Sequence, residues 1–516
     1  MSLIGLDVGT SGCKAALFSE TGQMLAAAYA EYDNLHPQPG WAELDAVDVW
    51  AKVCRSLRHV AACPGAGADP VKALAVSSLG EASVPVSRDR QILGPSILNF
   101  DSRGREYLAG LRAGLSAEAL SAEALSAERL YQINGNTLGN NYGLTKLMWI
   151  KEHQLELYER TYKFLNWGCF VSFMLGAEPV IDYSLANRLL LFDLEDGDWS
   201  AELLAWARLD REKLPAAAPS GTVIGQMEAG LAGELGLPSN VAIVTGAHDQ
   251  CANAVGCGGI QEGRPMYGMG TFLCAVPVFS QPRPAAAMIE RGLNTEHHAV
   301  PGCYVSFIYN QGGSLFKWYR DTFAAVERRQ AAAEGVDIYA RLLAEMPSEP
   351  SRVMVLPHFT VTGPPQFIDD SSGVLVGLTL ETSRAEILKG ILEGATFYMR
   401  QVLETLPGVG IQVDGYRAVG GGSKSDAWLQ LSADILGKPL VRAAVSEAGA
   451  LGAAILAGSG AGLFSSMAEG CQAMVRLGQE FEPDARRQSQ YERRFAKYQK
   501  LWPLMAAYLR ELADPC

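Results

Sequence analysis

The chain reads IGLDVGTSGCKAAL at residues 4–17 and YGMGTFLCAV at residues 267–276. In each stretch an apolar run is followed by a turn containing glycine and threonine, and then by a second apolar run. This order predicts two strands joined by a tight turn, because glycine permits close backbone approach and conformations that other residues avoid. Successive N–H groups in such a turn can bind an anion. Two such turns in one chain predict a phosphate chain held from both sides.

The polar residues of these turns are candidate ligands for phosphate and for a metal ion. Asp7 ends the first predicted strand and is a candidate Mg²⁺ ligand, because Mg²⁺ takes oxygen ligands and often only one or two carboxylates. Capping of the turn is the structural alternative for Asp7. Lys14 pointing into solvent is an equally open alternative to phosphate binding. The candidate phosphate-binding residues are Gly9, Thr10, Ser11, Lys14, Gly270 and Thr271.

The chain has 516 residues, which is more than one hydrophobic core usually holds and predicts two domains. An apolar strand pattern restarts near residue 245, so we expect domains over residues 1–245 and 246–516. The net charge of −13 argues against nucleic acid or an anionic membrane surface as the main partner.

The ten cysteines form no C-x-x-C pair and no zinc-like spacing. We therefore expect a reduced, cytoplasmic protein, and the N-terminus shows no basic segment or cleavage site of a signal peptide. Residues 448–468 carry no charge, but they are too small and polar for a membrane span. A buried helix over residues 448–457 is the better interpretation.

Strand-like and helix-like patterns alternate in both halves, which predicts an α/β fold with mixed sheets flanked by helices. In the first half we expect strands over residues 3–18, 24–32 and 241–245, and helices over 41–59, 144–153, 156–175 and 199–214, with Asp45 as the N-cap of the first helix. In the second half we expect strands over residues 266–279, 303–309 and 415–419, and helices over 314–325, 337–345, 383–406 and 426–436. Residues 116–130 nearly repeat SAEAL, which predicts a surface helix.

The run GAHDQ at residues 246–250 directly follows a predicted strand. Ligand sites of α/β proteins form beyond the carboxyl ends of strands, and a carboxylate there can accept a proton from a hydroxyl. Asp249 is therefore the candidate general base, with the N-cap of a following helix as the alternative. His248 is a candidate substrate contact, with a purely structural role as the alternative.

The loop GGGSKS at residues 420–425 lies between a predicted strand and a predicted helix. It matches neither a Walker A motif nor a complete G-x-G-x-x-G motif. Its glycines permit close approach to a flat group such as adenosine, and a flexible turn is the alternative. The candidate nucleotide contacts are Gly421, Gly422 and Ser425.

Polar and aromatic side chains also gather on predicted loops and strand ends of the first half. Polyols are recognised by carboxylates and amides, often beside an aromatic face. Each of these residues alone fits an ordinary surface or salt-bridge group, but together they form a candidate acceptor pocket, which consists of Trp41, Glu43, Glu81, Asp101 and Arg103.

These motifs resemble the FGGY family of carbohydrate kinases, within the actin/Hsp70/hexokinase superfamily, in the family's order and over nearly the whole chain. The first half contributes GLDVGTSGCKAALFSETG, PGWAELDAVDVW at residues 39–50 and IDYSLANRLLLFDLEDGDWS at residues 181–200. The second half contributes GAHDQ, YGMGTF, GLTLETSRAEILKGILEGATF at residues 377–397, and GGGSKSDAWLQLSADILGKPL followed by EAGALGAAILA. Seven segments in register make the resemblance specific.

The resemblance implies two actin-like, ribonuclease H-like domains with the site in a central cleft. It implies an ATP-dependent kinase that uses Mg²⁺ and acts on a small sugar or polyol, with no nucleic-acid or membrane partner; a homodimer is left open. Asp249 is then the base and Asp7 the metal ligand. The first domain would hold the acceptor sugar and the first phosphate loop, and the second domain the catalytic aspartate region, the second phosphate loop and the adenosine.

Xylulokinase-like members are the most similar in pattern, but two segments depart from them. Residues 78–82 read SLGEA where xylulokinases carry Gln-Met-His, and residues 99–103 read NFDSR where they carry Trp-Asn-Asp-Gly-Arg. Glu81 stands where glycerol kinases have the glutamate of an Arg-Glu pair, but the arginine position is Gly80. The acceptor pocket is therefore not that of a plain xylulokinase or of a plain glycerol kinase. The resemblance implies D-xylulose or a related ketose or polyol as the acceptor. Gluconate, glycerol or a pentitol is the first alternative, and an actin-like ATPase without an acceptor is the second.

Overall fold

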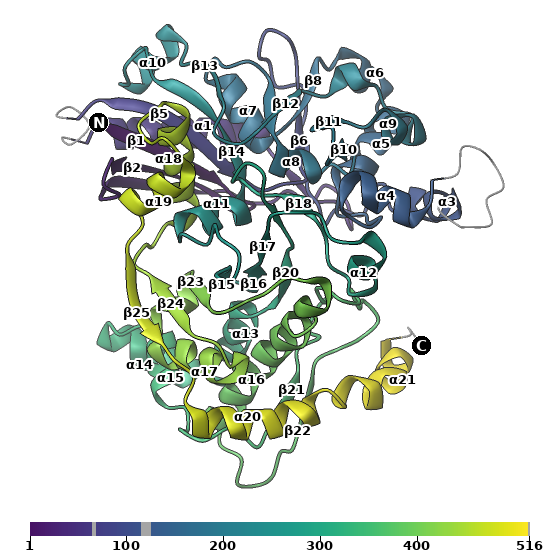
Figure 1. The fold of residues 1–516 in the computed structure, drawn as a ribbon, viewed down its shortest axis with the longest axis vertical. Helices are drawn as coiled ribbons and strands as arrows, with labels where there is room; N and C mark the ends of the chain where they lie inside the picture. The colour runs from purple at the N-terminus through teal and green to yellow at the C-terminus, as the bar shows by residue number, and fades with distance from the viewer. Residues whose placement is uncertain (64–68, 115–124, 514–516) are drawn as a thin grey trace.

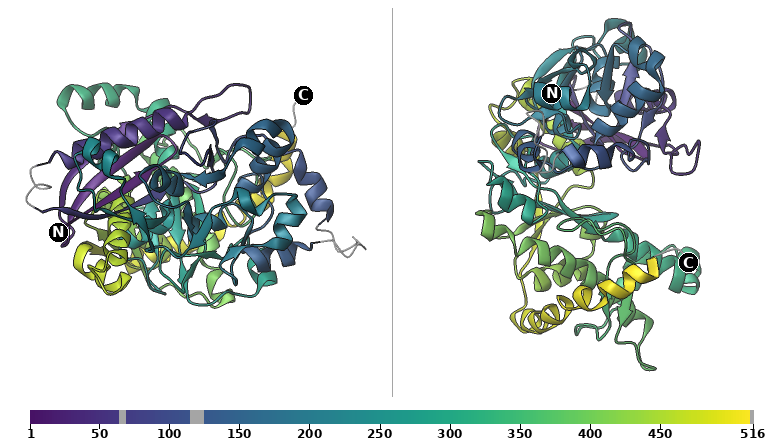
Figure 2. Two further views of the ribbon diagram at one scale, coloured as in Figure 1. Left: turned by 90° about the horizontal axis from the view of Figure 1, so that it is seen from above. Right: turned by 90° about the vertical axis from the view of Figure 1, so that its right-hand side faces the viewer.

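A computed structural model of the protein describes residues 1–63, 69–114 and 125–513. The chain folds into two lobes, each built around a six-stranded mixed sheet (Figure 1). The right-hand view of Figure 2 shows the two lobes one above the other, with the N-terminal strands in the upper lobe and the C-terminal helices in the lower.

The first sheet has the strand order β13-β14-β5-β1-β2-β3. Strand β1 pairs antiparallel with β2 and parallel with β5, and β5 pairs parallel with β14. The strands are β1 (Ser2–Val8), β2 (Gly12–Ser19), β3 (Met24–Glu31), β5 (Val71–Ser78), β13 (Val223–Gln226) and β14 (Ala242–His248).

The second sheet repeats this arrangement with the order β20-β16-β15-β23-β24-β25. Strand β15 pairs antiparallel with β16 and parallel with β23, and β23 pairs parallel with β24. The two sheets share one topology, which confirms the predicted α/β fold with two related domains. The strands are β15 (Met266–Met269), β16 (Phe272–Val276), β20 (Ile308–Gln311), β23 (Tyr416–Val419), β24 (Leu440–Ala443) and β25 (Leu477–Phe481).

Both faces of the first sheet are covered, because successive side chains of a strand point to opposite faces. Ile4 and Leu6 of β1 join a core with α1 (Ala46–Ala61) and α7 (Trp167–Met174). Leu3 lies on the other face, in a core with α11 (Asp249–Gly256) and α18 (Ala448–Gly460). The second sheet is covered on one face by α13 (Gly313–Phe323), α16 (Arg384–Leu403) and α17 (Asp426–Leu436).

Helix α18 comes from the second half of the chain but packs against β1, β5 and β14 of the first sheet (Figure 1). Glycines make this close contact possible. A Cβ atom on Gly5 would lie 1.7 Å from the carbonyl oxygen of Ala450, and one on Gly452 would lie 1.9 Å from that of Ala252. The uncharged segment therefore forms the buried helix that the sequence predicts. No helix among the described residues is long and apolar enough to cross a membrane.

The prediction of one helix over residues 156–175 is wrong. This segment forms α6 (Leu155–Arg160), β8 (Lys163–Asn166) and α7, because β8 pairs with β6 (Ser83–Val86), a tertiary contact that helical periodicity does not reveal. The helix predicted over residues 199–214 is shortened to α9 (Ala201–Ala207), which ends at Arg208 with a positive φ of 53°.

Helix α1 begins at residue 46 rather than 41, because the Asp45 side chain caps it by accepting from the amides of Val47 and Asp48. Most of the SAEAL repeat lies outside the described residues, and its last residues, 127–130, begin α4 (Ala127–Asn134). Strand β14 runs across residue 245, so the division into residues 1–245 and 246–516 stays a prediction.

Candidate active site

Four polar side chains meet at one edge of the first sheet. Because β1, β5 and β14 are parallel neighbours, their carboxyl ends lie together. Asp7 lies near the end of β1, and its Oδ1 accepts a hydrogen bond from the Ser77 hydroxyl of β5 at 2.8 Å. Strand β14 ends at His248, and Asp249 begins α11. The topology thus brings together residues that are far apart in the sequence.

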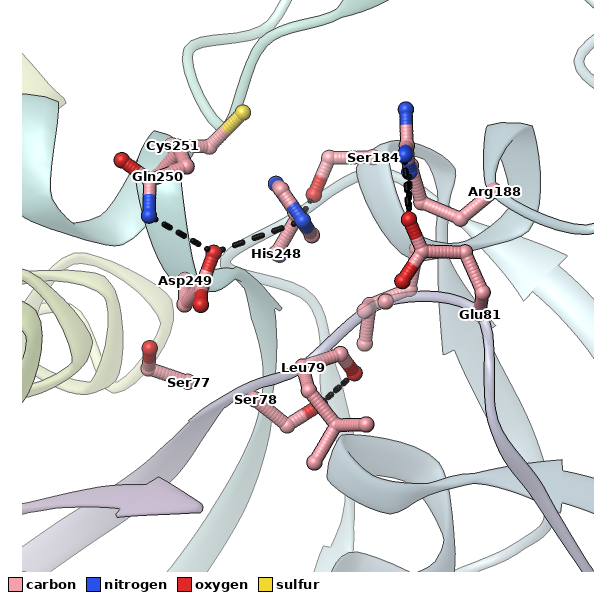
Figure 3. A network of polar contacts seen from close by, with 12 residues as sticks. Ser77, Ser78, Leu79, Glu81, Ser184, Arg188, His248, Asp249, Gln250 and Cys251 are labelled. Atoms are coloured by element: carbon pink, nitrogen blue, oxygen red, sulfur yellow. Dashed lines mark hydrogen bonds and ion pairs between the residues drawn. The ribbon is translucent and has the colours of Figure 1, made fainter. Parts of the chain in front are cut away.

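The Asp249 carboxylate has an environment that suits a base near neutral pH. Burial raises its pKa to about 7, and the neighbouring carboxylates of Asp7 and Glu81 act in the same direction. Its Oδ1 lies 3.2 Å from Nε2 of Gln250 and 3.3 Å from Nε2 of His248 (Figure 3). The side chain keeps 30% of its surface exposed, so an acceptor can reach it.

His248 is buried and neutral. Burial lowers the pKa of its imidazole well below the ordinary value, and the positive charge of Arg188 lowers it further. Its backbone amide donates to the Ser184 hydroxyl at 2.9 Å, and its ring lies 5.0 Å from the ring of Phe307. Within the described residues, Nδ1 of His248 is buried without a hydrogen-bond partner, so this atom remains for a ligand.

Lys14 does not point freely into solvent. It faces Asp7 across the β1–β2 pair, and its Nζ forms an ion pair with Glu447, which directly precedes α18. Burial raises the pKa of Asp7, while the Ser77 hydroxyl and the Lys14 charge oppose this rise. No group of three or more potential metal ligands occurs in the described part of the chain. Asp7 and Glu447 are compatible with Mg²⁺, because this ion is commonly held by one or two carboxylates together with substrate phosphates and water.

The two predicted phosphate turns have free backbone donors. In the first turn, Gly9 N–H bonds to the Gly12 carbonyl, whereas the amides of Thr10 and Ser11 have no partner among the described residues. In the second turn, Gly270 N–H bonds to the Phe272 carbonyl at 3.0 Å, and the Thr271 amide is likewise free in the described structure. Such unpaired amides on exposed turns are suited to phosphate oxygens.

The glycine loop after β23 forms a short 3₁₀ turn, η3 (Gly421–Lys424). A Cβ atom on Gly421 would meet no atom within 4 Å, whereas one on Gly422 would lie 2.7 Å from the Trp428 ring. The Ser425 hydroxyl caps α17 by accepting from the Trp428 amide at 3.2 Å. Gly421 therefore borders open space. Gly422 instead packs closely against the Trp428 ring, and Ser425 caps α17.

The predicted acceptor set divides into two clusters. In one, Arg103 bonds to Asp101 and Glu43 at 2.6 Å each and lies 4.0 Å from the Trp41 ring centre. The Asp101 side chain is fully buried and also accepts from the Ala42 amide. All its hydrogen-bonding capacity is used within the fold, so the expectation that Asp101 and Arg103 line the acceptor pocket finds no support in this geometry.

The second cluster includes Glu81 and four residues that sequence reasoning missed. Arg188 forms an ion pair with Glu81 and donates from Nη1 to Oε1 of Glu296 at 2.5 Å. Its guanidinium lies 5.1 Å from the Tyr142 ring and 5.7 Å from that of Phe307. The only signal in the sequence was an arginine within the apolar run ANRLLLF, since a charge in such a run must find a partner.

Comparisons with known proteins agree with this architecture. The chain matches the N-terminal domain of the FGGY family of carbohydrate kinases over residues 2–256 and the C-terminal domain over residues 267–461. It is 24% identical to a xylulose kinase of Bacillus subtilis (strain 168) over 505 residues, covering 97% of this chain and 96% of the relative.

A glycerol kinase of Acidovorax sp. (strain JS42) is 29% identical over 513 residues, covering 96% of this chain and 97% of the relative. The crystal structure of a xylulose kinase from Rhodospirillum rubrum superposes with a TM-score of 0.86 at 25% identity, covering 99% of this chain and 100% of the other. The chain belongs to the FGGY family of carbohydrate kinases and is an ATP-dependent sugar kinase.

Proposed function

We propose that this kinase transfers the γ-phosphoryl group of ATP to a hydroxyl of a ketose or polyol, with D-xylulose among the acceptors. The observation that carries the proposal is the Asp249 carboxyl, which follows β14 with a pKa near neutral and lies beside Asp7. Relatives named for xylulose and for glycerol match this chain at similar identity, so the acceptor is argued from the site.

In the proposed reaction the Asp249 carboxylate accepts the proton of the acceptor hydroxyl. The acceptor oxygen forms a bond to the γ-phosphorus while the bond from that phosphorus to the β–γ bridging oxygen breaks, and ADP leaves. His248 holds Asp249 in place through Nε2. Glu81 orients the acceptor, and the free amides of Thr10, Ser11 and Thr271, together with Gly9 and Gly270, hold the phosphates. Gly421 borders the adenosine.

Asp7 and Glu447 would hold Mg²⁺, which when bound neutralises phosphate charge. Lys14 pairs with Glu447 in this structure and faces Asp7 across the first hairpin, so we expect its ammonium to contact a phosphate oxygen. A cytoplasmic location and a homodimer stay predictions. An actin-like ATPase without an acceptor does not agree with membership of a carbohydrate kinase family.

The replacement Asp249→Asn tests this proposal, because asparagine keeps the shape of the side chain but cannot accept the proton. We expect kcat on the best acceptor to fall by roughly 10²–10⁴ while the KM for ATP stays nearly unchanged. Initial rates of ADP release measure both quantities. Asp48→Asn, which removes a half-exposed carboxylate of α1, is the control. Near wild-type kcat in Asp249→Asn would reject the assignment.

A further inference from the structure

Arg188 is a nearly buried cation that the proposed reaction leaves without a role. It caps the C-terminus of α8 (Tyr183–Asn187), and its side chain is only 11% exposed. Nε donates to Oε1 of Glu81 at 3.1 Å, Nη2 donates to the same oxygen, and Nη1 donates to Glu296. Figure 3 shows the Glu81–Arg188 pair on the opposite side of His248 from Asp249. Arg188 therefore belongs to the same polar site as the base.

The glycine at position 80 makes room for this arginine. A Cβ atom on Gly80 would lie 2.7 Å from Cγ of Arg188 and 2.8 Å from Cδ2 of His248. Any larger residue would have to displace one of these side chains. In this chain the cation beside Glu81 therefore comes from the end of α8 and not from the neighbouring position 80.

The charges of the cluster do not balance. Two carboxylates, Glu81 and Glu296, surround one guanidinium, and Asp249 adds a further acidic group whose pKa responds to Glu81. Burial alone would lower the pKa of Arg188, but Glu296 and Glu81 hold it well above the ordinary value. Burial raises the pKa of Glu296, and Arg188 opposes this rise. The cluster thus places three carboxyl groups around one guanidinium, an arrangement that disfavours an anionic ligand.

Hydrogen-bonding capacity remains for uncharged hydroxyls. Oε1 of Glu81 accepts both bonds from Arg188, and Oε2 of Glu81 has no hydrogen-bond partner in the described part of the chain. Nδ1 of His248 is also free among the described residues. A hydroxyl can donate to Oε2 or bond to Nδ1 without adding charge, whereas a carboxylate would place a third anion beside Glu81 and Asp249.

We propose that the carboxylates of Glu81 and Glu296, held in place by Arg188, make the acceptor site select uncharged polyols and ketoses over sugar acids of the same carbon skeleton. This inference rests on the proposed function and adds a substrate class to it. Arg188 acts as a positioning residue: it fixes Glu81 by two bonds and ties it to Glu296 of the second half of the chain.

Matched acceptor pairs test the inference. Ribitol and ribonate, and sorbitol and gluconate, differ only in having a terminal CH₂OH group or a carboxylate. We expect the full-length protein to give a kcat/KM at least about tenfold higher for the better neutral member than for its acid. Calorimetric titration of the same pairs measures binding without turnover and should show the same preference. A preference for the acid in both measurements would overturn the inference.

Two variants examine the cluster itself. Glu296→Gln keeps the hydrogen bond to Arg188 but removes a negative charge, so the neutral-to-acid ratio should fall by about tenfold. Glu290→Gln removes an exposed carboxylate of the same half and should leave the ratio unchanged.

Gly80→Ala displaces Arg188 or His248 and should raise the KM for the acceptor by about tenfold or more with little change in the KM for ATP. Unchanged ratios in Glu296→Gln or an unchanged acceptor KM in Gly80→Ala would contradict the role of Arg188.

The two proposals fail in different ways. If ATP is consumed without transfer to any acceptor, the proposed function fails, while the calorimetric preference between ribitol and ribonate still decides the inference. If Asp249→Asn abolishes transfer as expected but the acids are the better acceptors, the proposed function stands and the inference is rejected.

Discussion

The Asp249 carboxyl needs to be ionised to accept a proton, and its surroundings place this ionisation near neutral pH. Burial and the carboxylates of Asp7 and Glu81 raise its pKa to about 7, above the ordinary range of aspartate. Below that pH the carboxyl is protonated and cannot act as a base, whereas above it the carboxylate is present. The activity should therefore be lost toward acid pH, at values where most aspartates remain ionised.

We expect kcat/KM for the acceptor to decrease about tenfold per pH unit below an apparent pKa near 7, because this quantity reports ionisation in the free enzyme. Initial rates between pH 5 and pH 9 at fixed ionic strength measure the profile, and thermal unfolding at each pH shows whether the protein stays folded. A flat profile between pH 5.5 and 7.5 with intact protein would show that another group is the base.

The sequence could place Asp7 and Asp249 at one edge of the sheet, because Asp7 lies near the end of one apolar strand, Asp249 directly follows another, and the carboxyl ends of parallel strands meet. It could not predict Arg188, whose partners Glu81 and Glu296 are 107 and 108 residues away. No motif links these positions, and only the fold brings them together. For Asp101 and Arg103 the sequence could not distinguish a ligand site from a closed ion pair, because their spacing fits both.

Helix α16 carries a buried carboxyl that couples folding to pH. Oε1 of Glu393 accepts from the Ser351 amide at 2.9 Å and from the Tyr491 hydroxyl at 3.0 Å. Burial raises the pKa of Glu393 to about 7, although these hydrogen bonds and Arg494 act in the other direction. The folded protein therefore binds a proton more tightly than the unfolded chain. This contribution to stability is full below the unfolded pKa of about 4.3 and is lost as pH rises to about 7.

Glu393→Gln should make stability less dependent on pH. A difference of this size between folded and unfolded pKa values corresponds to about 4 kcal/mol. We expect the variant to lose less stability than the wild type between pH 5 and pH 8, as measured by urea unfolding at each pH. Glu381→Gln, at an exposed position just before the same helix, is the control. Equal pH slopes in wild type and Glu393→Gln would contradict the titration assigned to this carboxyl.

The loop before α17 allows a clean test of nucleotide binding. A Cβ atom on Gly421 meets nothing within 4 Å, so Gly421→Val should leave the fold intact. If adenosine lies against this backbone, the KM for ATP should rise by about tenfold or more, while the KM for the acceptor stays constant. Steady-state kinetics measure both, and Gly233→Val, at another glycine with open space, is the control. A change in the acceptor KM alone would assign the loop to the acceptor pocket.

Local patterns predicted elements that carry their own start signals. Asp45, Ser383 and Ser425 each cap the helix that follows, as their residue types favour. The helix prediction for residues 156–175 was wrong, because this segment contains the short strand β8, which is defined by its pairing with β6. The two similar hairpin sequences indicated that the chain contains two related sheets. The packing of α18 against the first sheet could not be predicted from the sequence, because it is a tertiary contact between distant segments.

Several contacts tie the two halves of the chain together. Helix α18 lies on the first sheet, the Lys14–Glu447 ion pair joins the first hairpin to the start of this helix, and the His297 amide donates to the Asn187 side chain at 3.0 Å. The phosphate turns, however, belong to different sheets. A nucleotide held by both turns would therefore connect the sheets directly, and its binding should be detected at two places in the molecule at once.

Hydrogen exchange measures this connection. The amides of Thr10, Ser11 and Thr271 have no partner in the described structure, so they should exchange fast in the free protein. A non-hydrolysable ATP analogue with Mg²⁺ should slow exchange in peptides covering both turns, with the same half-saturating concentration, because one ligand contacts both. The turn at residues 20–22, at the other end of β2, serves as the control and should not change. Asp249→Asn should preserve the double protection, since the base does not hold phosphate. Protection of one turn alone, or two different half-saturating concentrations, would show that the turns do not share a nucleotide.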